Sequence, residues 1–521
     1  MRIPLTPVRC LTRAADLFSE KIGVVCGEKR FTYREFDERC RRLSSALRGA
    51  GVEPGDRVAY LSYNTHQLLE GYYGAPIIRA IVMPLNVRLT RPELTAIVAH
   101  AEPKILFYET EFASTVSLLR AGSPSLRIIN LDTEYEDFVG QGHPVPIDIT
   151  SYDEDAIAEL FYTSGSTGTP KGVMLSHRTL YLHALNSVGS MDLNHHGVEL
   201  HTIPLFHANG WGRPQTATMM GIKQIMVRRF ECPTVCRLIQ DERATSLSIV
   251  PTMANALLAF EQRADFDLSS LEQVFIGGAA SSPALIRNLE HAFRCEILAG
   301  YGLTETSPVA TSARRKSTVF YTSDEDRWER QSYPGWPIFG AEVRVVDAGM
   351  QPVPQDFSTV GEIVIRGDMV MDGYYREPEA TAAAITGGWL HTGDMAVWDQ
   401  ENYIQIVDRK KDIIISGGEN ISSIEIEKAI ALHPSVAEAA VVSAPDDKWG
   451  EIPVAFVVTK PGCVLLESEL GAWLTARLAR FKIPRRYVIQ PDALPKGGTG
   501  KILKKDLREP FWRERQRRVQ G

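Results

Sequence analysis

Apolar residues near the start of the chain recur at the spacing of one helix face. From Phe36 to Leu47 they stand three or four residues apart, which is the period of an amphipathic helix. Thr32 followed by Glu35 has the pattern of a capping box, and Gly51 stands where such a helix would end. The pattern predicts a helix between these two signals.

Short β-rich runs then alternate with helical stretches along the chain. Residues 57–61, 245–250 and 272–277 are such runs, and their alternation with helices predicts an α/β fold with parallel sheets. Farther along, the sequence pattern changes to one of strands and turns, with clear short strands at 343–347 and 361–365. We expect a β-rich subdomain there.

A charged segment at 408–412 separates this β-rich part from a new α/β pattern, which has a capped helix at 423–430 and a strand at 439–442. The chain has 521 residues, which is too long for one ordinary core. The sequence therefore predicts a large N-terminal domain over 1–408. It also predicts a small, mobile α/β domain over 409–521, with a hinge near the charged segment.

Composition narrows the class of protein. A net charge of -7 and a pI near 6.0 give no cationic surface for phosphates, so nucleic acid is not an expected partner. The first twenty residues lack the apolar stretch of a secretory signal. We expect a cytoplasmic protein, monomeric or homodimeric, and peripheral membrane contact stays open. The seven cysteines show no paired metal-ligand spacing, which favours buried reduced thiols.

The richest local signal is the segment 161–172, Phe-Tyr-Thr-Ser-Gly-Ser-Thr-Gly-Thr-Pro-Lys-Gly. Glycines let main-chain N–H groups approach an anion, hydroxyls add donors, and Lys171 adds positive charge, so the loop can hold phosphate. It is not the P-loop of NTPases, because Lys171 is followed by Gly172. It is not a hydrolase elbow either, because 165–168 is one residue too short.

This loop resembles the signature loop of the adenylate-forming superfamily, which includes acyl-CoA synthetases, luciferases and the adenylation domains of peptide synthetases. Further segments similar to that family follow in the family's order, at 300–305, 391–394, 408–412, 416–420 and 495–501. The resemblance implies activation of a carboxylic acid by ATP as an acyl-adenylate, followed by transfer of the acyl group to coenzyme A.

The resemblance also implies roles for individual residues. Glu305 and Thr163 fit ligands of Mg²⁺, and Asp394 would hold the ribose of ATP. The catalytic candidates are Lys501, Glu305, Thr163 and His207, with Lys501 bridging the carboxylate and the α-phosphate. The nucleotide-binding candidates are Thr163, Ser164, Gly165, Ser166, Thr167, Gly168, Lys171, Gly277, Gly278, Ala279, Gly300, Tyr301, Gly302, Thr304, Asp394, Arg409, Lys411 and Lys501.

The segment 204–211, Pro-Leu-Phe-His-Ala-Asn-Gly-Trp, bears on the acid. Peptide-synthetase domains place an aspartate where this chain has His207, so an α-amino acid is disfavoured. The Phe-His-x-Asn-x-Trp pattern is similar to fatty acyl-CoA synthetases, in which Trp211 would gate the acyl tunnel. Arg213 and Gln215 follow where apolar residues are commoner, which leaves a medium-chain, branched or functionalised acid open.

The acceptor is expected to be coenzyme A. Its pantetheine arm would pass near Gly417 and Gly418, and these join His207 and Trp211 as the acyl- and CoA-binding candidates. A fatty acyl-AMP ligase that loads a carrier protein is the nearest alternative, and the segment between Asp394 and Asp412 lacks the insertion typical of that group. An aryl-acid ligase and a silent nucleotide sensor are further alternatives, and the pairing of Glu305 with Lys501 argues against a sensor.

Overall fold

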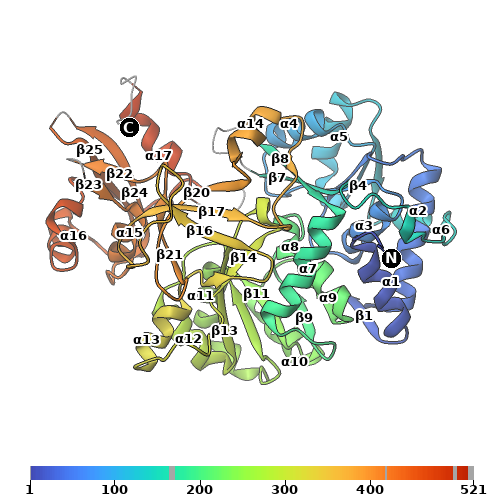
Figure 1. Cartoon of the computed structure of the whole chain (residues 1–521), viewed down its shortest axis with the longest axis horizontal. Helices are drawn as coiled ribbons and strands as arrows, with labels where there is room; N and C mark the ends of the chain where they lie inside the picture. The colour runs from blue at the N-terminus through green and yellow to red at the C-terminus, as the bar shows by residue number, and fades with distance from the viewer. Residues whose placement is uncertain (1, 164–169, 417–418, 447, 497–501, 514–521) are drawn as a thin grey trace. The chain divides into compact units, whose positions relative to one another are not determined.

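The computed structural model describes residues 2–163, 170–416, 419–446, 448–496 and 502–513. The chain forms two compact units (Figure 1). Unit 1 comprises 1–343, 364–391 and 399–404, and unit 2 comprises 344–363, 392–398 and 405–521. The predicted boundary at 408–412 stays a prediction, because this division also assigns two earlier segments to unit 2.

The larger sheet of unit 1 has nine strands. In order they are β15 (Trp336–Pro337), β14 (Val309–Ser312), β13 (Glu296–Gly302), β12 (Gln273–Ile276), β11 (Ser246–Ile249), β9 (Val198–His201), β10 (Lys223–Met226), β1 (Ile22–Cys26) and β2 (Lys29–Thr32). The six strands from β13 to β1 are parallel to one another. A core of Leu247, Ile249, Val274 and Ile276 covers one face of this sheet.

A second sheet of unit 1 has seven strands. In order they are β18 (Gly373–Tyr374), β8 (Lys171–Ser176), β7 (Ile157–Thr163), β4 (Ile81–Pro84), β3 (Arg57–Leu61), β5 (Ile105–Tyr108) and β6 (Arg127–Asn130). The five strands from β7 to β6 are parallel, and β8 and β18 are antiparallel additions. The prediction of an α/β fold with parallel-rich sheets is confirmed.

The remaining strands form two smaller sheets. The division between the units passes through the first, which has β16 (Glu342–Val346), β17 (Gly361–Arg366), β20 (Trp389–Trp398) and β19 (Ile385–Thr386) in order, with β21 (Ile404–Arg409) beside β20. The second lies in unit 2 and has β23 (Glu419–Ile421), β22 (Ile414–Ser416), β25 (Gly450–Thr459) and β24 (Val436–Asp446), with β26 (Arg486–Gln490) parallel to β25.

The helices of unit 1 are α1 (Val8–Leu17), α2 (Tyr33–Gly49), α3 (His66–Ile77), α4 (Arg91–Ala101), α5 (Ala113–Gly122), α6 (Tyr135–Gly140), α7 (His177–Met191), α8 (Ala208–Trp211), α9 (Arg213–Met220), α10 (Cys232–Glu242), α11 (Pro251–Ala259), α12 (Pro283–Phe293), α13 (Asp324–Gln331) and α14 (Pro378–Ala384). Those of unit 2 are α15 (Ser423–Ala431), α16 (Glu467–Thr475) and α17 (Lys504–Trp512). No described helix is long and apolar enough to cross a membrane.

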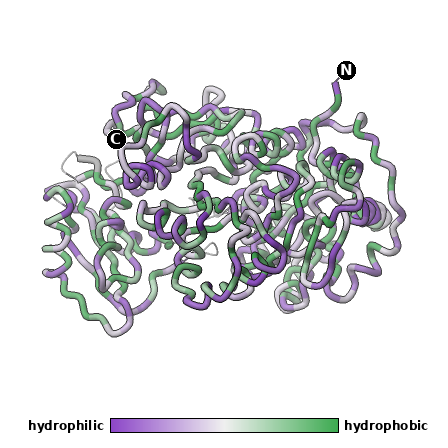
Figure 2. Tube along the Cα trace, turned by 90° about the horizontal axis from the view of Figure 1, so that it is seen from below, coloured by the Kyte–Doolittle hydropathy of each residue, from purple (hydrophilic) through white to green (hydrophobic). Residues whose placement is uncertain are grey.

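The predicted first helix is α2. Thr32 and Glu35 form both bonds of the capping box, and the apolar face from Phe36 to Leu47 is buried. Figure 2 shows how the chain changes between hydrophobic and hydrophilic positions within a few residues along its length. The thiol prediction is wrong for Cys463, which is exposed, whereas Cys10, Cys40, Cys236 and Cys295 are buried. Cys26 and Cys232 are half-buried, so the prediction of buried thiols is confirmed for four of the seven cysteines.

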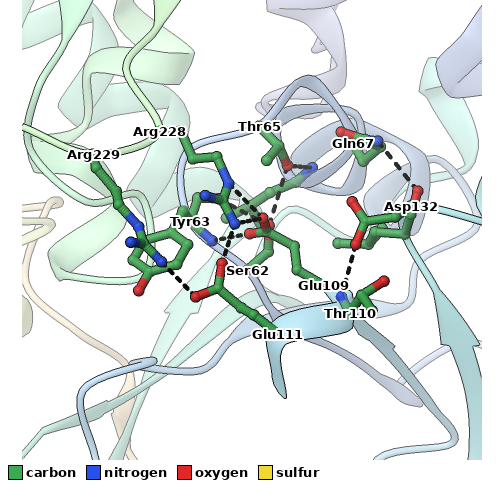
Figure 3. Close-up of polar contacts among 12 residues, drawn as sticks. Ser62, Tyr63, Thr65, Gln67, Glu109, Thr110, Glu111, Asp132, Arg228 and Arg229 are labelled. Atoms are coloured by element: carbon green, nitrogen blue, oxygen red, sulfur yellow. Dashed lines mark hydrogen bonds and ion pairs between the residues drawn. The ribbon is translucent and has the colours of Figure 1, made fainter. Parts of the chain in front are cut away.

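A polar cluster joins the two large sheets of unit 1 where β3, β5 and β10 end (Figure 3). Buried Glu109 accepts hydrogen bonds from the Tyr63 main-chain N–H at 2.6 Å and from the Arg228 Nε at 2.7 Å. Arg228 and Arg229 both stack on the Tyr63 ring and both pair with Glu111. The cluster fixes the two sheets against each other within the unit.

Candidate active site

The flanks of the glycine-rich segment lie in unit 1 beside Glu305. Thr163 ends β7 and is the register partner of Lys171, which begins β8. The Lys171 Nζ lies 4.9 Å from the centre of the Tyr374 ring, and the Tyr374 hydroxyl donates a hydrogen bond of 2.9 Å to Glu305 Oε1. Lys171 and Glu305 are thus connected through Tyr374, and Thr163 pairs with Lys171.

Tyr374 was not predicted, because it stands in a two-residue strand with no local motif. It reaches this place because β18 pairs with β8, where Tyr374 is opposite Val173. Burial and the neighbouring Glu305 carboxylate raise the pKa of the Tyr374 hydroxyl, so it remains a hydrogen-bond donor at neutral pH. The Glu305 carbonyl accepts from the Met371 N–H at 2.8 Å, which holds the glutamate at both its main chain and its side chain.

The carboxyl ends of β12 and β13 carry the predicted glycines. A Cβ added to Gly277 would lie 3.2 Å from the Gly300 carbonyl oxygen and 3.3 Å from the Trp211 ring. At Gly302 it would lie 1.8 Å from the Pro308 carbonyl oxygen, so no larger residue fits that position. Gly278, Ala279, Tyr301 and Thr304 lie on the same strand ends or just after them.

Trp211 is buried and belongs to an apolar cluster with Phe275 and Leu298. Its ring meets the Phe275 ring edge-on, with the ring centres 5.8 Å apart. The residue predicted for the acyl chain therefore contacts the strand ends predicted for the nucleotide. In α/β sheets, ligands bind at the carboxyl ends of parallel strands.

Trp211 stands on a short left-handed turn. Ala208, Asn209, Gly210, Trp211 and Gly212 have φ between 42° and 71°. This conformation costs about 1–2 kcal/mol for each residue other than glycine. It must be held by contacts, and such strained segments are common at functional sites. Half-buried His207 precedes the turn, and its carbonyl accepts from the Gly210 N–H at 3.1 Å.

The contacts that hold this turn come largely from Asn209. Its side-chain oxygen accepts a hydrogen bond of 2.5 Å from the Gly212 N–H. Its amide nitrogen donates to Glu159 Oε2 at 3.3 Å, and the Gln215 amide donates to Glu159 Oε1 at 2.5 Å. Burial raises the pKa of Glu159 to about 8 although the two amides lower it. Glu159 is therefore a neutral carboxylic acid at pH 7.

Glu159 was also missed by the sequence reasoning. The available signal was a single acid inside an otherwise apolar strand, at Ile157-Ala158-Glu159-Leu160-Phe161. A charged residue in a strand buried on both faces requires partners. Those partners are Asn209 and Gln215, two residues of the segment predicted for acyl selection.

Arg213 anchors the same segment on the other sheet. It begins α9, is 3% exposed, and its Nε lies 3.0 Å from Glu199 Oε1 on β9. The second Glu199 oxygen accepts from the Ser246 hydroxyl on β11. The sequence marked Arg213 and Gln215 only as unusual polar residues, and both are buried in the interior between the two sheets.

Unit 2 carries the predicted ribose residue. Asp394 on β20 is buried, and its Oδ1 lies 2.6 Å from the Arg409 Nε on β21. Its main-chain N–H donates to the Thr392 hydroxyl at 3.1 Å. Two predicted nucleotide residues, Asp394 and Arg409, are thus paired.

The start of the predicted hinge is also in unit 2. Asp408 is buried and accepts from the Arg409 N–H at 2.7 Å and from the Ser423 N–H at the start of α15. The Lys411 carbonyl accepts from Arg508 at 3.1 Å, and burial lowers the pKa of the Lys411 ammonium.

Several predicted residues lie outside the described residues. They are Ser164, Gly165, Ser166, Thr167, Gly168, Gly417, Gly418 and Lys501. Their predicted roles in holding phosphate, passing the pantetheine arm and supplying the catalytic ammonium stay predictions.

Two family profiles match the chain. That of the AMP-binding enzymes matches residues 11–375, and that of the AMP-binding enzyme C-terminal domain matches residues 425–501. A long-chain-fatty-acid–CoA ligase of Thermus thermophilus is 38% identical over 96% of this chain and 94% of its own length. A peroxisomal butyrate–CoA ligase of Arabidopsis thaliana is 35% identical, with 97% and 93% covered.

Solved structures are similar over nearly the whole chain. The o-succinylbenzoate CoA synthetase of Bacillus subtilis, in complex with ATP and a magnesium ion, has a TM-score of 0.84 and 26% identity. The match covers 96% of this chain and 98% of that one. These three proteins act on a long-chain acid, a short-chain acid and an aryl acid by name, so similarity alone leaves the acid undefined.

Proposed function

The chain belongs to the family of AMP-binding enzymes, as an AMP-forming acid–CoA ligase, and on that premise we propose that its acid is a fatty acid or a close relative. The overall reaction joins the acid to coenzyme A and converts ATP to AMP and pyrophosphate. The finer proposal concerns which acid enters and which residues of this chain act on it.

The observation that carries the proposal is the contact of Trp211 with the strand ends at Gly277. Its indole ring belongs to a buried apolar cluster that also contains Phe275 and Leu298 on the same sheet face. A hydrocarbon chain is stabilised on an apolar surface by about 25 cal/mol for each Å² of apolar area that it buries. The acid's carboxylate would lie at the strand ends and its chain beside Trp211.

The first half-reaction places two anions together. A carboxylate oxygen of the acid attacks the α-phosphorus of ATP, a P–O bond forms, and pyrophosphate leaves. The residues present fit Mg²⁺, because Glu305 offers a carboxylate fixed by Tyr374 and Thr163 offers a hydroxyl at the end of β7. Mg²⁺, when bound, supplies positive charge to the phosphates. We propose that Lys501 supplies the remaining charge between the carboxylate and the α-phosphate.

The second half-reaction transfers the acyl group. The sulfur of coenzyme A attacks the acyl carbonyl carbon after losing its proton, a thioester forms, and AMP leaves with the bonding electrons. Asp394, supported by Arg409 at 2.6 Å, would accept hydrogen bonds from the two ribose hydroxyls in both halves. Lys501 must leave the carbonyl before the sulfur approaches it, and we propose that the segment 408–412 is the hinge for this movement.

The proposal is tested by measuring the two products separately. Purified protein with ATP and Mg²⁺ is offered straight-chain fatty, aryl and amino acids, and pyrophosphate release and thioester formation are followed with coenzyme A or with a phosphopantetheinyl carrier protein. We expect pyrophosphate release with fatty acids and a thioester with coenzyme A. Release with aryl acids alone would refute the fatty-acid proposal, and a thioester on the carrier protein alone would refute coenzyme A as the acceptor.

A further inference from the structure

Beyond Trp211, the face of the nine-stranded sheet becomes polar. Glu199, Ser246 and Gln273 are register partners on three neighbouring strands. Ser248 is two residues nearer the carboxyl end of its strand than Ser246 and is the register partner of Phe275. Because alternate residues of a strand share a face, and Leu247 and Ile249 belong to the opposite core, these polar residues lie on the same face as Phe275 and Trp211.

Hydrogen-bonding atoms on this face are left without partners among the described residues. The Arg213 guanidinium uses Nε for Glu199 and places Nη1 3.1 Å from the Met191 sulfur, and its Nη2 has no partner. The Ser248 hydroxyl and the Gln273 Oε1 are also unpartnered. Arg213 is 3% and Ser248 is 2% exposed.

The residues that carry these atoms are neighbours in the fold. Gln273 donates to the Met191 carbonyl at 3.2 Å, so Arg213 and Gln273 meet at the same methionine. Ser248 lies one strand repeat after Ser246. The Ser246 hydroxyl donates to the carboxylate of Glu199, which pairs with Arg213. Buried polar groups are almost always hydrogen-bonded, and several orphans together point to a bound polar group or water.

We call Glu199, Arg213, Ser248 and Gln273 the polar floor of this face. Its position along the strands relates it to the acid. Along a strand, residues rise about 3.3 Å each, so Gln273 lies about 13 Å below the level of Gly277 and Phe275 about 7 Å below it. Ser248 is at the level of Phe275. An acid with its carboxylate at the strand ends and its hydrocarbon part beside Trp211 and Phe275 would bring its far end to Ser248 and Arg213.

The charges on the polar floor indicate which kind of ligand group it can bind. Arg213 and Glu199 neutralise each other, and burial keeps the neighbouring His201 neutral because it lowers the pKa of the imidazole. A second carboxylate would bring a negative charge that no unpaired cation there matches. An uncharged oxygen suits the free Arg213 N–H and the Ser248 hydroxyl, and a hydroxyl could also donate to Gln273.

We propose that this floor binds an uncharged oxygen, a hydroxyl or a carbonyl, at the far end of the acyl chain. The inference rests on the proposed function and narrows its substrate to hydroxy- or oxo-carboxylic acids. Arg213, Ser248 and Gln273 are then specificity-determining residues, and Glu199 positions Arg213.

The test compares acids of equal chain length that differ only at the far end: unsubstituted, hydroxylated and carboxylated. The value of kcat/KM is measured for each acid across short and medium lengths. A site built to hydrogen-bond a substrate group rejects the analogue that lacks it, so we expect the hydroxy acid to be preferred by about tenfold or more at one length.

Two variants remove the floor in different ways. Ser248→Ala deletes one hydroxyl without changing charge, and the double variant Arg213→Met with Glu199→Gln removes both charges together, so that neither is left buried alone. Each should reduce the preference for the hydroxy acid over the unsubstituted acid by about tenfold. Ser44→Ala is the control, since Ser44 is a buried serine of α2 whose hydroxyl bonds main-chain carbonyls.

The outcomes separate the inference from the proposed function. If wild type prefers the unsubstituted acid at every length and Ser248→Ala leaves that order unchanged, only water occupies the floor and the inference is overturned. A preference for the carboxylated acid would overturn the assignment to an uncharged group. Failure to release pyrophosphate with every acid would instead overturn the proposed function, and the inference with it.

Discussion

Glu159→Gln should remove a pH-dependent loss of stability from this protein. Glu159 is fully buried on β7, and burial raises its pKa to about 8 against the lowering effect of the Asn209 and Gln215 amides. In the unfolded chain the pKa would be near 4.5. The unfolded chain therefore releases this proton first as the pH rises.

The sign and size of the effect follow from these two values. Between about pH 4.5 and about pH 8 the folded state holds one more proton than the unfolded state, so the free energy of unfolding falls as the pH rises. One pKa unit corresponds to about 1.4 kcal/mol, so the loss reaches about 3 kcal/mol at pH 7 and approaches its limit of about 5 kcal/mol above pH 8. Above the folded-state pKa the loss does not increase further.

Glutamine keeps the shape of the protonated acid and does not ionise. Its carbonyl can accept from the Asn209 amide. Once the Gln215 amide turns over, the introduced amide can donate to the Gln215 Oε1, which has no partner among the described residues. We expect Glu159→Gln to be at least as stable as wild type at pH 8. The difference in the free energy of unfolding between the two proteins should decrease toward pH 5. Glu159→Ala should be less stable at every pH, because it leaves both amides unpaired beside a cavity.

Urea unfolding of the wild type and variants at half-unit steps from pH 5 to pH 8 measures this difference. Glu70→Gln is the matched control. Burial raises the pKa of Glu70, but His66 and Arg39 outweigh it and lower the value to about 2. Its stabilising effect is therefore complete above the unfolded-state pKa and is lost only as the pH falls toward 2. The Glu70→Gln variant should be less stable than wild type throughout the tested range. Parallel curves of stability against pH for wild type and Glu159→Gln would refute a neutral Glu159.

Three further predictions concern the proposed reaction. Trp211→Ala should change the preference among acids by about 1–3 kcal/mol in kcat/KM with little change in the KM for ATP, and lost ATP binding with an unchanged preference would remove Trp211 from the acyl site. Glu305→Gln should raise the Mg²⁺ concentration needed for half-maximal pyrophosphate release, and Tyr374→Phe should do so more weakly because the carboxylate remains; unchanged Mg²⁺ titrations would exclude Glu305 as a ligand. Lys501→Ala should slow acyl-adenylate formation by about 10²- to 10³-fold and spare thioester formation from supplied acyl-adenylate, whereas Lys411→Pro should do the reverse; equal slowing of both steps by Lys501→Ala would contradict one lysine serving one half-reaction.

Local signals predicted the elements of this fold well. The capping box at Thr32 predicted where α2 begins, and the runs at 57–61 and 272–277 are strands β3 and β12 within one residue at each end. These features depend on residues close in the chain, so their pattern is visible in the sequence.

Contacts between distant residues could not be read in the same way. Tyr374 reaches Glu305 only because β18 pairs with β8, and no spacing in the sequence predicts that pairing. Glu159 and Asn209 are fifty positions apart. Their partnership depends on how α8 lies between two sheets, which is a property of the tertiary fold.

The two buried carboxylates that hold the start of α9 differ in charge, and that difference bears on the acid. Glu159 is neutral and bonded to amides, whereas Glu199 is paired with the Arg213 guanidinium, which keeps one N–H without a partner. A buried ion pair seldom stabilises a fold more than apolar residues of equal volume, and an orphan N–H adds to its cost. Stability alone therefore does not explain an arginine at position 213. A ligand oxygen that bonds this N–H would offset the cost only when the acid is bound. This hydrogen bond would then contribute to substrate selection and not to the free energy of folding.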